Sequence, residues 1–545
     1  MRKVENILFI MCDQLRQDYL SCYGHPHLQT PNIDRLAERG TRFTRAFVQS
    51  PVCGASRMSF YTGRYVQSHG ASWNGFPLKV GEMTLGDYLR ARGMDVALVG
   101  KTHMRADMEG MERLGIDPDS IIGVRVSECG FDPYERDDGL HGIGPDGRYE
   151  PKNPRYNEYL RDKGYGGDNP WHDWANAAVG EGNKIASGWA MRHAAKPARV
   201  AEEDSETPYM TRRAIEYMEQ AKKPWCLHLS YIKPHWPYIA PAPYNNMFGK
   251  DAVQPAIRSE RERDNPHPIY REFMDLRVSR NFGRNEVREE VIPVYMGLIK
   301  QIDDQMGVLF DYMSRKGLIE NTMIVFASDH GDYLGDHWMG EKDLFHDQSV
   351  KIPLIVYDPR SADTSKNVCD ELVESIDIVP TLLDAVGGDV SGQSHRIEGR
   401  SLSPFLKGEK PETWRSYAIS EYDYSVLPVA VKLNIAPRDA RLFMVANKKW
   451  KYIHAPGFGP MLFDLVNDPQ EFEDLGTNPE YTSVRDMLQN VLNNWGLRYS
   501  QRTTRSEQQI LAARGKSTRK GILIGVWDEN ELPEELWSAY LGGEK

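Results

Sequence analysis

Cysteine is scarce in this sequence, and the few cysteines are not grouped. Six cysteines occur in 545 residues, and no two of them are separated by only two residues: Cys12, Cys22, Cys53, Cys129, Cys226 and Cys369. Disulfide-rich domains and thiolate zinc sites depend on close, regular cysteine spacing. The sequence therefore argues against both.

Long apolar runs are also missing. No run reaches the roughly 20 residues that cross a bilayer. The run NILFIMC near the amino terminus stops at Asp13 and Gln14, which makes it too short for the apolar region of a secretory signal, and no small-residue cleavage site follows. We therefore expect a cytoplasmic protein, in a reducing compartment, with no membrane partner.

Charge gives no sign of a polyanionic partner. The formal net charge is -11 at pH 7 and the pI is about 5.8, so we expect no binding to nucleic acid. The composition is that of an ordinary globular protein, with 40% hydrophobic residues. A chain of 545 residues is long enough for two domains, or for one large domain with a smaller partner. No repeat or low-complexity tract is visible.

Five apolar runs are continuous rather than alternating, namely residues 6–13, 95–101, 225–232, 322–329 and 352–358. Continuous runs are typical of strands that are buried on both faces of a parallel sheet. Helical patterns lie between them, and the longest covers about residues 286–316. The sequence therefore predicts an α/β fold with a large, mostly parallel sheet, whose ligands bind at the carboxyl ends of the strands.

The pattern changes near residue 405. RLFMVANKKWKYIHAPG and MLFDLVNDP read as short antiparallel strands, and a helical pattern follows near 481–497. We expect a catalytic α/β domain, a small α+β subdomain built on a short antiparallel sheet, and a carboxyl-terminal tail, with bounds of 1–400, 401–505 and 506–545. The tail is rich in apolar side chains that need to be buried: Ile522, Ile524, Val526, Trp527, Leu536, Trp537, Tyr540 and Leu541.

Metal-ligating side chains follow two of the predicted strands. Asp13 and Gln14 end the first strand, while Asp329 and His330 end the fourth. Three hard oxygen donors and one imidazole predict a site for a single divalent cation, and the nitrogen donor tilts the choice slightly from Ca²⁺ toward Mn²⁺. The alternative is that Asp13 and Asp329 only cap the helices that follow.

Basic side chains occur beside the other strands. Lys101 and His103 follow the second strand, Lys233 and His235 follow the third, and Lys342 precedes the fifth. Cations and imidazoles around a metal ion suit a tetrahedral oxyanion, because negative charge builds on its oxygens and on the leaving group. A single histidine of this kind is more often a hydrogen-bonded surface residue.

One cysteine lies in an unusual setting. Cys53 begins the stretch CGASR, with Arg57 four residues later and Pro51 just before it. Structural cysteines occur mostly within apolar runs. The small neighbours instead predict a side chain that is presented at the start of a helix.

Taken together, these stretches resemble the type I sulfatases of the alkaline phosphatase superfamily. CGASR resembles the family signature C/S-x-P/A-x-R, and the other stretches fall in the family's order: NILFIMCDQ, GRY, GKTHM, KPHWPY and SDHGDYLGDHWMGEK. The resemblance covers about residues 4–390. It implies the sulfatase fold and a hydrolase of sulfuric esters.

The resemblance also implies a chemistry for Cys53. In this family the signature cysteine is oxidised to formylglycine, an aldehyde, by a formylglycine-generating enzyme. One oxygen of the hydrated aldehyde attacks sulfur or phosphorus and forms a covalent intermediate, and the other hydroxyl then expels the sulfate. The family pattern assigns further roles as follows: metal binding to Asp13, Gln14, Asp329 and His330; orientation of the formylglycine to Arg57 and Lys101; breakdown of the hemiacetal to His103; contact with the transferring group and the leaving oxygen to His235 and Lys342; and a hydrogen bond to the anion to Asn74.

Differences from other family members concern both the signature around Cys53 and the expected substrate. Ala55 stands where most members have proline. Gln14 and His330 resemble the phosphonate monoester hydrolases and choline sulfatases, whereas Lys101 and His103 resemble the sulfatases proper. We expect an arylsulfatase-like hydrolase of sulfate monoesters that also accepts phosphonate monoesters and phosphate diesters. The alternative is a phosphonate monoester hydrolase or phosphodiesterase as the main activity.

Two other function classes compete with these. A two-metal phosphomonoesterase would need a second ligand set, and one clear set is visible. A binding protein without activity would be expected to lack the nucleophile or a ligand. The expected partners are a small sulfate or phosphonate ester, the maturation enzyme, and further copies of the chain in a homodimer or homotetramer, brought together by the tail.

Overall fold

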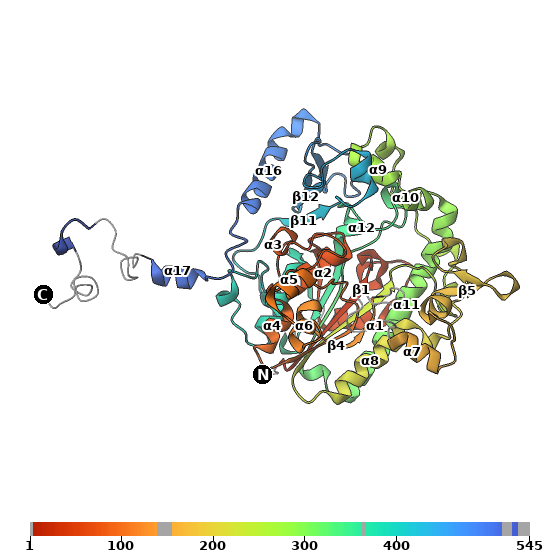
Figure 1. The fold of residues 1–545 in the computed structure, drawn as a ribbon. Coiled ribbons are helices and arrows are strands. Elements are labelled where there is room, and N and C mark those ends of the chain that lie inside the picture. Colours follow the sequence, from red (N-terminus) through yellow and green to blue (C-terminus); the bar gives the residue numbers. More distant parts are fainter. Residues whose placement is uncertain (1–3, 139–154, 362–366, 515–525, 532–545) are drawn as a thin grey trace.

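A large central sheet dominates the computed structural model (Figure 1), which describes residues 4–138, 155–361, 367–514 and 526–531. Within these residues the sheet has eight strands in the order β10-β2-β9-β8-β1-β7-β3-β4. The strands are β1 (Asn6–Asp13), β2 (Thr41–Phe47), β3 (Asp95–Gly100), β4 (Asp132–Arg136), β7 (Trp225–Pro234), β8 (Thr322–Ser328), β9 (Lys351–Tyr357) and β10 (Asn367–Glu374). A separate hairpin pairs β5 (Ala177–Val179) with β6 (Ile185–Ser187).

The predicted α/β fold with a mostly parallel sheet is confirmed. All five continuous runs are strands: β1, β3, β7, β8 and β9. The sheet is mixed, however, because β9 runs antiparallel to both β8 and β2. A strand that is buried on both faces has the same apolar pattern in either direction, so the sequence could not reveal this reversal.

Alternate residues of β1 enter two hydrophobic clusters, one on each face of the sheet. Ile7, Phe9 and Met11 lie in one cluster, while Leu8, Ile10 and Cys12 lie in the other. The first face is covered by α2 (Cys53–Thr62), α4 (Leu85–Arg90) and α13 (Ile378–Ala385), and the second by α1 (Pro31–Arg39), α8 (Glu206–Gln220) and α11 (Asn285–Arg315). Burial on both faces explains why the strand sequences are apolar throughout.

Shorter helices connect these layers or lie at their margins. They are α3 (Val66–His69), α5 (Met108–Leu114), α6 (Ile121–Ser127), α7 (Arg155–Asp162), α9 (Pro268–Met274), α10 (Arg277–Phe282), α12 (Asp347–Val350), α14 (Ser403–Leu406), α15 (Pro428–Lys432) and α17 (Glu507–Ala513). No helix in the described ranges is long and apolar enough to cross a membrane.

A second, antiparallel sheet follows the large one in the sequence, as predicted. It contains β11 (Ala418–Asp423), β12 (Arg441–Ala446), β13 (Trp450–His454) and β14 (Met461–Asp464), and α16 (Thr482–Gly496) packs on β12 and β13. One face of this sheet joins the core of the large sheet through Met444 and Ile453, and the other packs under α16 through Val445 and Tyr452. The domain bounds at 400 and 505 stay a prediction.

One edge of the large sheet gathers the polar strand ends. β1, β3, β7 and β8 are mutually parallel, so their carboxyl ends meet at this edge. Because β9 runs the opposite way, the segment that precedes it reaches the same edge. That reversal is why Lys342, which comes before β9 in the chain, can join residues that follow the other strands.

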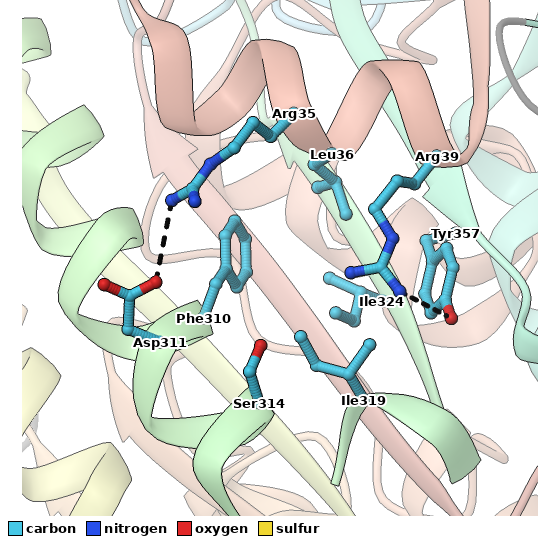
Figure 2. Close-up of a pocket in the computed structure, with 9 residues that line it drawn as sticks. All are labelled: Arg35, Leu36, Arg39, Phe310, Asp311, Ser314, Ile319, Ile324 and Tyr357. Carbon is cyan, nitrogen blue, oxygen red and sulfur yellow. Dashed lines mark hydrogen bonds and ion pairs between the residues drawn. The ribbon is translucent and has the colours of Figure 1, made fainter. Parts of the chain in front are cut away.

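The pocket in Figure 2 lies toward the opposite edge. It has a volume of about 80 Å³ and lies between α1, the end of α11, the start of β8 and the end of β9. In Figure 2, Arg35 reaches toward Asp311 (3.8 Å), and Arg39 donates to the Tyr357 hydroxyl (3.3 Å). None of the predicted site residues lines this pocket, so it lies outside the candidate active site.

Candidate active site

Cys53 is the first residue of α2 and is fully buried. Its Sγ lies 2.9 Å from Nε2 of His330 and 3.7 Å from Oδ1 of Asp13. The next backbone N–H, that of Gly54, donates to Oδ1 of Asn74 at 2.8 Å. Asn74 therefore holds the start of the helix, while the cysteine side chain faces the ends of β1 and β8.

Arg57 lies between the two predicted carboxylate ligands. Its Nε is 2.8 Å from Asp329 and its Nη2 is 3.2 Å from Asp13, with all three side chains fully buried. Lys101 makes a second ion pair with Asp13. Burial alone would raise the pKa of the Asp13 carboxyl, but the neighbouring cations, Lys101 first among them, hold that pKa well below its usual value.

His330 presents one ring nitrogen to this group. Its Nδ1 lies 2.8 Å from the carbonyl oxygen of Gly331, an acceptor, so Nδ1 carries a proton and Nε2 faces Cys53. Burial alone would lower the imidazole pKa, but the negative charge of Asp329 and then of Cys53 raises it to about 9. A divalent cation bound at Nε2 of His330 would replace the proton on that nitrogen, because a metal-bound imidazole is neutral.

Gln14 lies beside the same group in an uncommon backbone conformation, with φ of 66°. Its Nε2 donates to the Tyr238 hydroxyl at 3.1 Å and to the Asp332 carboxylate. Its Oε1 is buried and has no hydrogen-bond partner. A buried amide oxygen without a partner costs free energy, and a cation would supply the partner.

These residues fit a divalent metal ion. One ligand atom each from Asp13, Cys53, Asp329 and His330 lies within 4.8 Å of the others, and the free Gln14 oxygen adds another hard donor. Oxygen donors with one imidazole suit Mn²⁺ or Ca²⁺. The structure therefore brings three of the four predicted metal ligands together around Cys53, and the fourth, Gln14, contacts this group through its backbone N–H, which donates to Oδ1 of Asp329 at 3.0 Å.

A second group of potential ligands, Glu262, His337 and His346, does not extend this site. Its imidazole rings stack with centroids 3.8 Å apart and planes 9° apart. The lone pairs of stacked rings run parallel and do not converge on one ion. His337 Nδ1 already lies 2.6 Å from Glu262, and His346 Nδ1 lies 2.9 Å from the Tyr333 hydroxyl. These contacts already engage one nitrogen of each ring.

The remaining predicted residues are two neutral imidazoles and a lysine cation. Burial lowers the pKa of His235 to about 3 and that of His103 well below its usual value. His235 Nδ1 lies 3.0 Å from the Trp236 carbonyl oxygen, and His103 Nδ1 has no partner. Lys342 Nζ lies 2.7 Å from Glu341, and despite burial the negative charges of Cys53 and Glu341 hold its pKa well above the usual value.

Comparison with known proteins decides the family. The family model described as "Sulfatase" matches residues 5–388, and the model "N-sulphoglucosamine sulphohydrolase, C-terminal" matches residues 335–497. This chain belongs to the sulfatase family. The resemblance carried by CGASR and the other motifs is thereby confirmed.

Individual relatives agree on the chemistry class. The chain is 32% identical to the multifunctional alkaline phosphatase superfamily protein PehA of Trinickia caryophylli, over 94% of this chain and 99% of the relative. It is 27% identical to an arylsulfatase of Clostridium perfringens, over 89% and 93%. The phosphonate monoester hydrolase of Agrobacterium radiobacter superposes with a TM-score of 0.78 at 26% identity, over 91% and 96%. This sulfatase is therefore a hydrolase of sulfate or phosphonate esters.

Sequence reasoning missed three residues of the sulfatase site. Asp332 and Tyr238 hold the Gln14 amide, and Glu341 pairs with Lys342. Asp332 is the second carboxylate of SDHGD, so its position in that stretch was an available signal. Tyr238 and Glu341 lie in the stretches KPHWPY and SDHGDYLGDHWMGEK, and Glu341 directly precedes Lys342. Only the contact of Tyr238 with Gln14 depends on residues that are distant in the sequence.

Proposed function

We propose that this chain hydrolyses sulfate monoesters, in the manner of an arylsulfatase, after Cys53 is converted to formylglycine, and that it also accepts phosphonate monoesters and phosphate diesters. The observation that carries the proposal is the position of the Cys53 side chain, which lies among Asp13, Asp329 and His330 at the edge of the sheet. A structural thiol would gain nothing from two carboxylates and an imidazole. A group that reacts beside a cation requires them.

The proposed metal ligands are Asp13, Gln14, Asp329 and His330. A divalent ion held there, Mn²⁺ or Ca²⁺, would supply positive charge that stabilises the charge developing on an ester oxygen. Arg57 and Lys101 fix the Asp13 carboxylate, and Arg57 also fixes Asp329. The carboxylates therefore need little reorganisation when the ion binds.

Formylglycine, once formed from Cys53, would supply an aldehyde carbon that can be hydrated. A thiol has no such carbon. The other residues position the ester and move protons. Lys342 stays protonated and can neutralise an equatorial oxygen of the anion. His103 and His235 are neutral imidazoles, so each has a nitrogen that can accept a proton.

A second candidate function is phosphonate monoester or phosphodiester hydrolysis as the main activity. It is favoured by the Gln14 and His330 pair, by the similarity to PehA, and by the TM-score of 0.78 with a phosphonate monoester hydrolase. One metal ion and one set of cations would serve either tetrahedral centre, since both place negative charge on the same oxygens.

Activity profiling tests the proposal. The kcat/KM would be measured for an aryl sulfate, an aryl phosphonate monoester and an aryl phosphate diester, with the wild type and with Cys53→Ala. The sulfate ester should be the best substrate, and Cys53→Ala should lose nearly all turnover on all three. Cys369→Ala, on the edge strand β10, is the matched control and should keep full activity. A preference for the phosphonate would favour the second candidate, whereas an active Cys53→Ala would reject both.

The proposed function implies partners for maturation and assembly. Conversion of Cys53 needs a formylglycine-generating enzyme that reads CGASR with Ala55 in the third position. The tail 506–545 is proposed to pack on a neighbouring copy in a homodimer or homotetramer. In the described part of this tail, Trp527 is 94% exposed, which leaves a large apolar surface for a partner.

A further inference from the structure

A cavity of about 470 Å³ opens beside the start of α11. Three parts of the chain form its walls: residues 250–260, the first turn of α11 and Trp338. Its volume falls in the range of small-molecule sites, about 300–1,000 Å³. No residue of the candidate active site lines it.

The charges that line this cavity do not cancel. Lys250 is paired with Glu289 at 3.6 Å, and Glu260 is paired with Arg263 at 3.6 Å. Two further lining residues, Arg258 and Arg288, have no carboxylate oxygen within 4.0 Å in the ranges the structure describes. The cavity lining therefore includes two guanidinium groups without a direct ion pair, on which Asp336 acts at longer range.

Arg288 is the more deeply buried of the two. It is 6% exposed, and its Nε and Nη2 donate to the carbonyl oxygens of Leu334 (3.0 Å) and Gln254 (2.9 Å). Neutral carbonyl groups satisfy these hydrogen bonds without forming an ion pair. Burial lowers the pKa of the Arg288 guanidinium, and the negative charge of Asp336 offsets part of this effect.

Arg258 also lines the cavity, and two contacts fix its orientation. Its guanidinium stacks 4.3 Å from the centroid of the Trp338 ring, and its Nη2 donates to Oδ1 of Asn285 at 2.8 Å. Burial lowers its pKa, and the charge of Arg288 lowers it further. Both guanidinium groups line the same cavity, so an anion bound there would offset their positive charge.

The helix end adds to the positive potential. α11 is 31 residues long and begins at Asn285, with no side chain capping its amino terminus. The partial positive charge of a helix start favours an anion. Here it adds to two guanidinium groups at the same wall of the cavity.

We propose that this cavity binds a small molecule through an oxyanion group, a sulfate, phosphate or carboxylate. Two guanidinium groups offer several N–H donors at fixed angles, which suits the oxygens of these groups. Trp338 and Val253 provide apolar wall, so the cavity has room for an organic part attached to the anion. The site is separate from the Cys53 centre and would bind an anion without converting it.

Selenate locates the proposed site, because its selenium scatters anomalously. Crystals of the wild type soaked in selenate should show an anomalous peak between Arg258 and Arg288. Crystals of Arg258→Gln should lack this peak and keep any peak near Cys53. Selenate near Cys53 with none at the arginines would overturn the proposal.

Titration with sulfate, phosphate or citrate at constant ionic strength tests the site in solution. It also distinguishes the three proposed oxyanion groups, because citrate carries carboxylates. The melting temperature of the wild type should rise with at least one of them, and Arg258→Gln should shift its half-maximal concentration at least tenfold. Arg288→Gln should do the same if it folds; Arg258→Gln decides the test if it does not. Arg284→Gln is the matched control, since Arg284 precedes the same helix but does not line the cavity. Equal shifts in the wild type and Arg258→Gln would contradict the proposal.

A second inference concerns Gln14 and rests on the proposed function. Both hydrogens of its amide nitrogen are engaged, one by the Asp332 carboxylate and one by the Tyr238 hydroxyl, and that hydroxyl in turn donates to Asp332. A carboxylate only accepts hydrogen bonds. A flipped amide would therefore place its oxygen against a carboxylate oxygen.

We infer that Asp332 and Tyr238 are positioning residues that lock the Gln14 amide with its oxygen toward the metal ligands. Gln14 Oε1 is the atom without a hydrogen-bond partner. Since an amide presents either oxygen or nitrogen, Gln14 can ligate a cation only in one of two orientations. The carboxylate of Asp332 selects that orientation.

Isothermal titration of Mn²⁺ into chelator-treated protein tests the lock without measuring activity. Asp332→Asn keeps the shape but accepts either amide orientation, so it should weaken Mn²⁺ affinity about 10- to 100-fold. Tyr333→Phe alters the next residue, whose hydroxyl contacts His346 and not Gln14, and should leave the affinity unchanged. Equal affinities in the wild type and Asp332→Asn would overturn the inference. A wild type that binds no Mn²⁺ or Ca²⁺ would instead overturn the proposed function.

Discussion

At the scale of single residues, the candidate site consists of charged side chains that are buried in contact with side chains of opposite charge. Arg57 is fully buried, yet two carboxylates surround it, and Lys101 shares one of them. Ions leave water only when partners replace the lost hydration. Replacing one partner therefore affects stability as well as chemistry, so each variant at the site needs a folding measurement beside its activity.

The first prediction at this scale concerns the metal ion. Chelation should abolish turnover, and Mn²⁺ or Ca²⁺ should restore it, with one ion bound per chain. His330→Asn replaces a nitrogen donor with an oxygen donor and should shift the preference toward Ca²⁺. Metal analysis and activity after reconstitution provide the measurements. Two ions per active chain would instead indicate the phosphatase alternative.

The sequence could predict which residues meet at the site better than how they are oriented. Asp13, Gln14, Asp329 and His330 follow apolar strands, and parallel strands bring such ends together. The direction of the Gln14 amide depends on Tyr238 and Asp332, which lie 224 and 318 positions away. No local pattern encodes such contacts. Glu341, by contrast, directly precedes its partner Lys342 in the sequence.

At the scale of elements, the reversed strand β9 and the small sheet fix the segment that carries Lys342. Lys451 of β13 is fully buried and reaches this segment: its Nζ donates to the Phe345 carbonyl oxygen at 2.9 Å and pairs with Asp347 at 2.8 Å and Glu471 at 2.6 Å. The small sheet therefore supports the active-site edge of the large one.

Lys451→Met should destabilise the protein by about 3–5 kcal/mol, because it leaves the buried carboxylate of Glu471 without its cation. Turnover should fall as well, since the segment before β9 loses its anchor. Urea unfolding measures the first effect. Lys448→Met is the control: Lys448 is 45% exposed and pairs with Glu371 at the surface, so its loss should cost less than about 1 kcal/mol. Equal costs would reject the role given to Lys451.

A pH-dependent contact joins β11 to α3. Glu421 is buried, and its carboxylate accepts from the backbone N–H of Gln67 at 2.9 Å. Burial raises the pKa of this carboxyl from 4.5 to about 7. Because the folded pKa exceeds the unfolded one, the folded protein binds the extra proton between these values, and stability falls as the pH rises through them.

Glu421→Gln should therefore raise the melting temperature at pH 8 relative to the wild type, and change it little at pH 5. The amide keeps the hydrogen bond from Gln67 without the cost of a buried charge. Thermal unfolding at both pH values measures the difference. Glu412→Gln, at an exposed position, should show no such pH dependence. A Glu421→Gln effect of equal size at pH 5 and pH 8 would contradict this account.

The elements also show which sequence patterns are informative. The five buried runs were predictable because a strand that is buried on both faces is apolar throughout. The long helix was predictable because its buried stripe repeats with the helical period. β2 and β10 were not predicted, because TRFTRAF and NVCDELVE mix polar side chains into the strand. Strands of this kind are identified by their neighbours in the sheet rather than by their own composition.

At the scale of the whole molecule, the carboxyl-terminal tail, residues 506–545, is the segment that we propose packs on another copy of the chain. In Figure 1, α17 extends away from both sheets. Leu511 on this helix is 61% exposed. Most of the apolar tail residues predicted to need burial lie outside the described residues, among them Ile522, Ile524 and Trp537. Exposed apolar surface of this kind needs a partner.

Deleting residues 519–545 should convert a dimer or tetramer into a smaller species. The apolar side chains of the tail would no longer bridge two copies, and closed symmetric contacts would be lost. Light scattering measures the mass, and an activity assay shows whether the tail reaches a neighbouring active site. A deletion variant with the original mass and activity would indicate that the tail packs on its own chain.

The central claim is that Cys53 acts as formylglycine, and mass spectrometry of the tryptic peptide 46–57 tests it most directly. Protein would be produced with and without a formylglycine-generating enzyme. The fraction of peptide showing the mass loss from CH2SH to CHO would be compared with the turnover of an aryl sulfate. The account predicts that turnover rises in proportion to the converted fraction and is absent without conversion. Full turnover by protein whose Cys53 is entirely unmodified would contradict it.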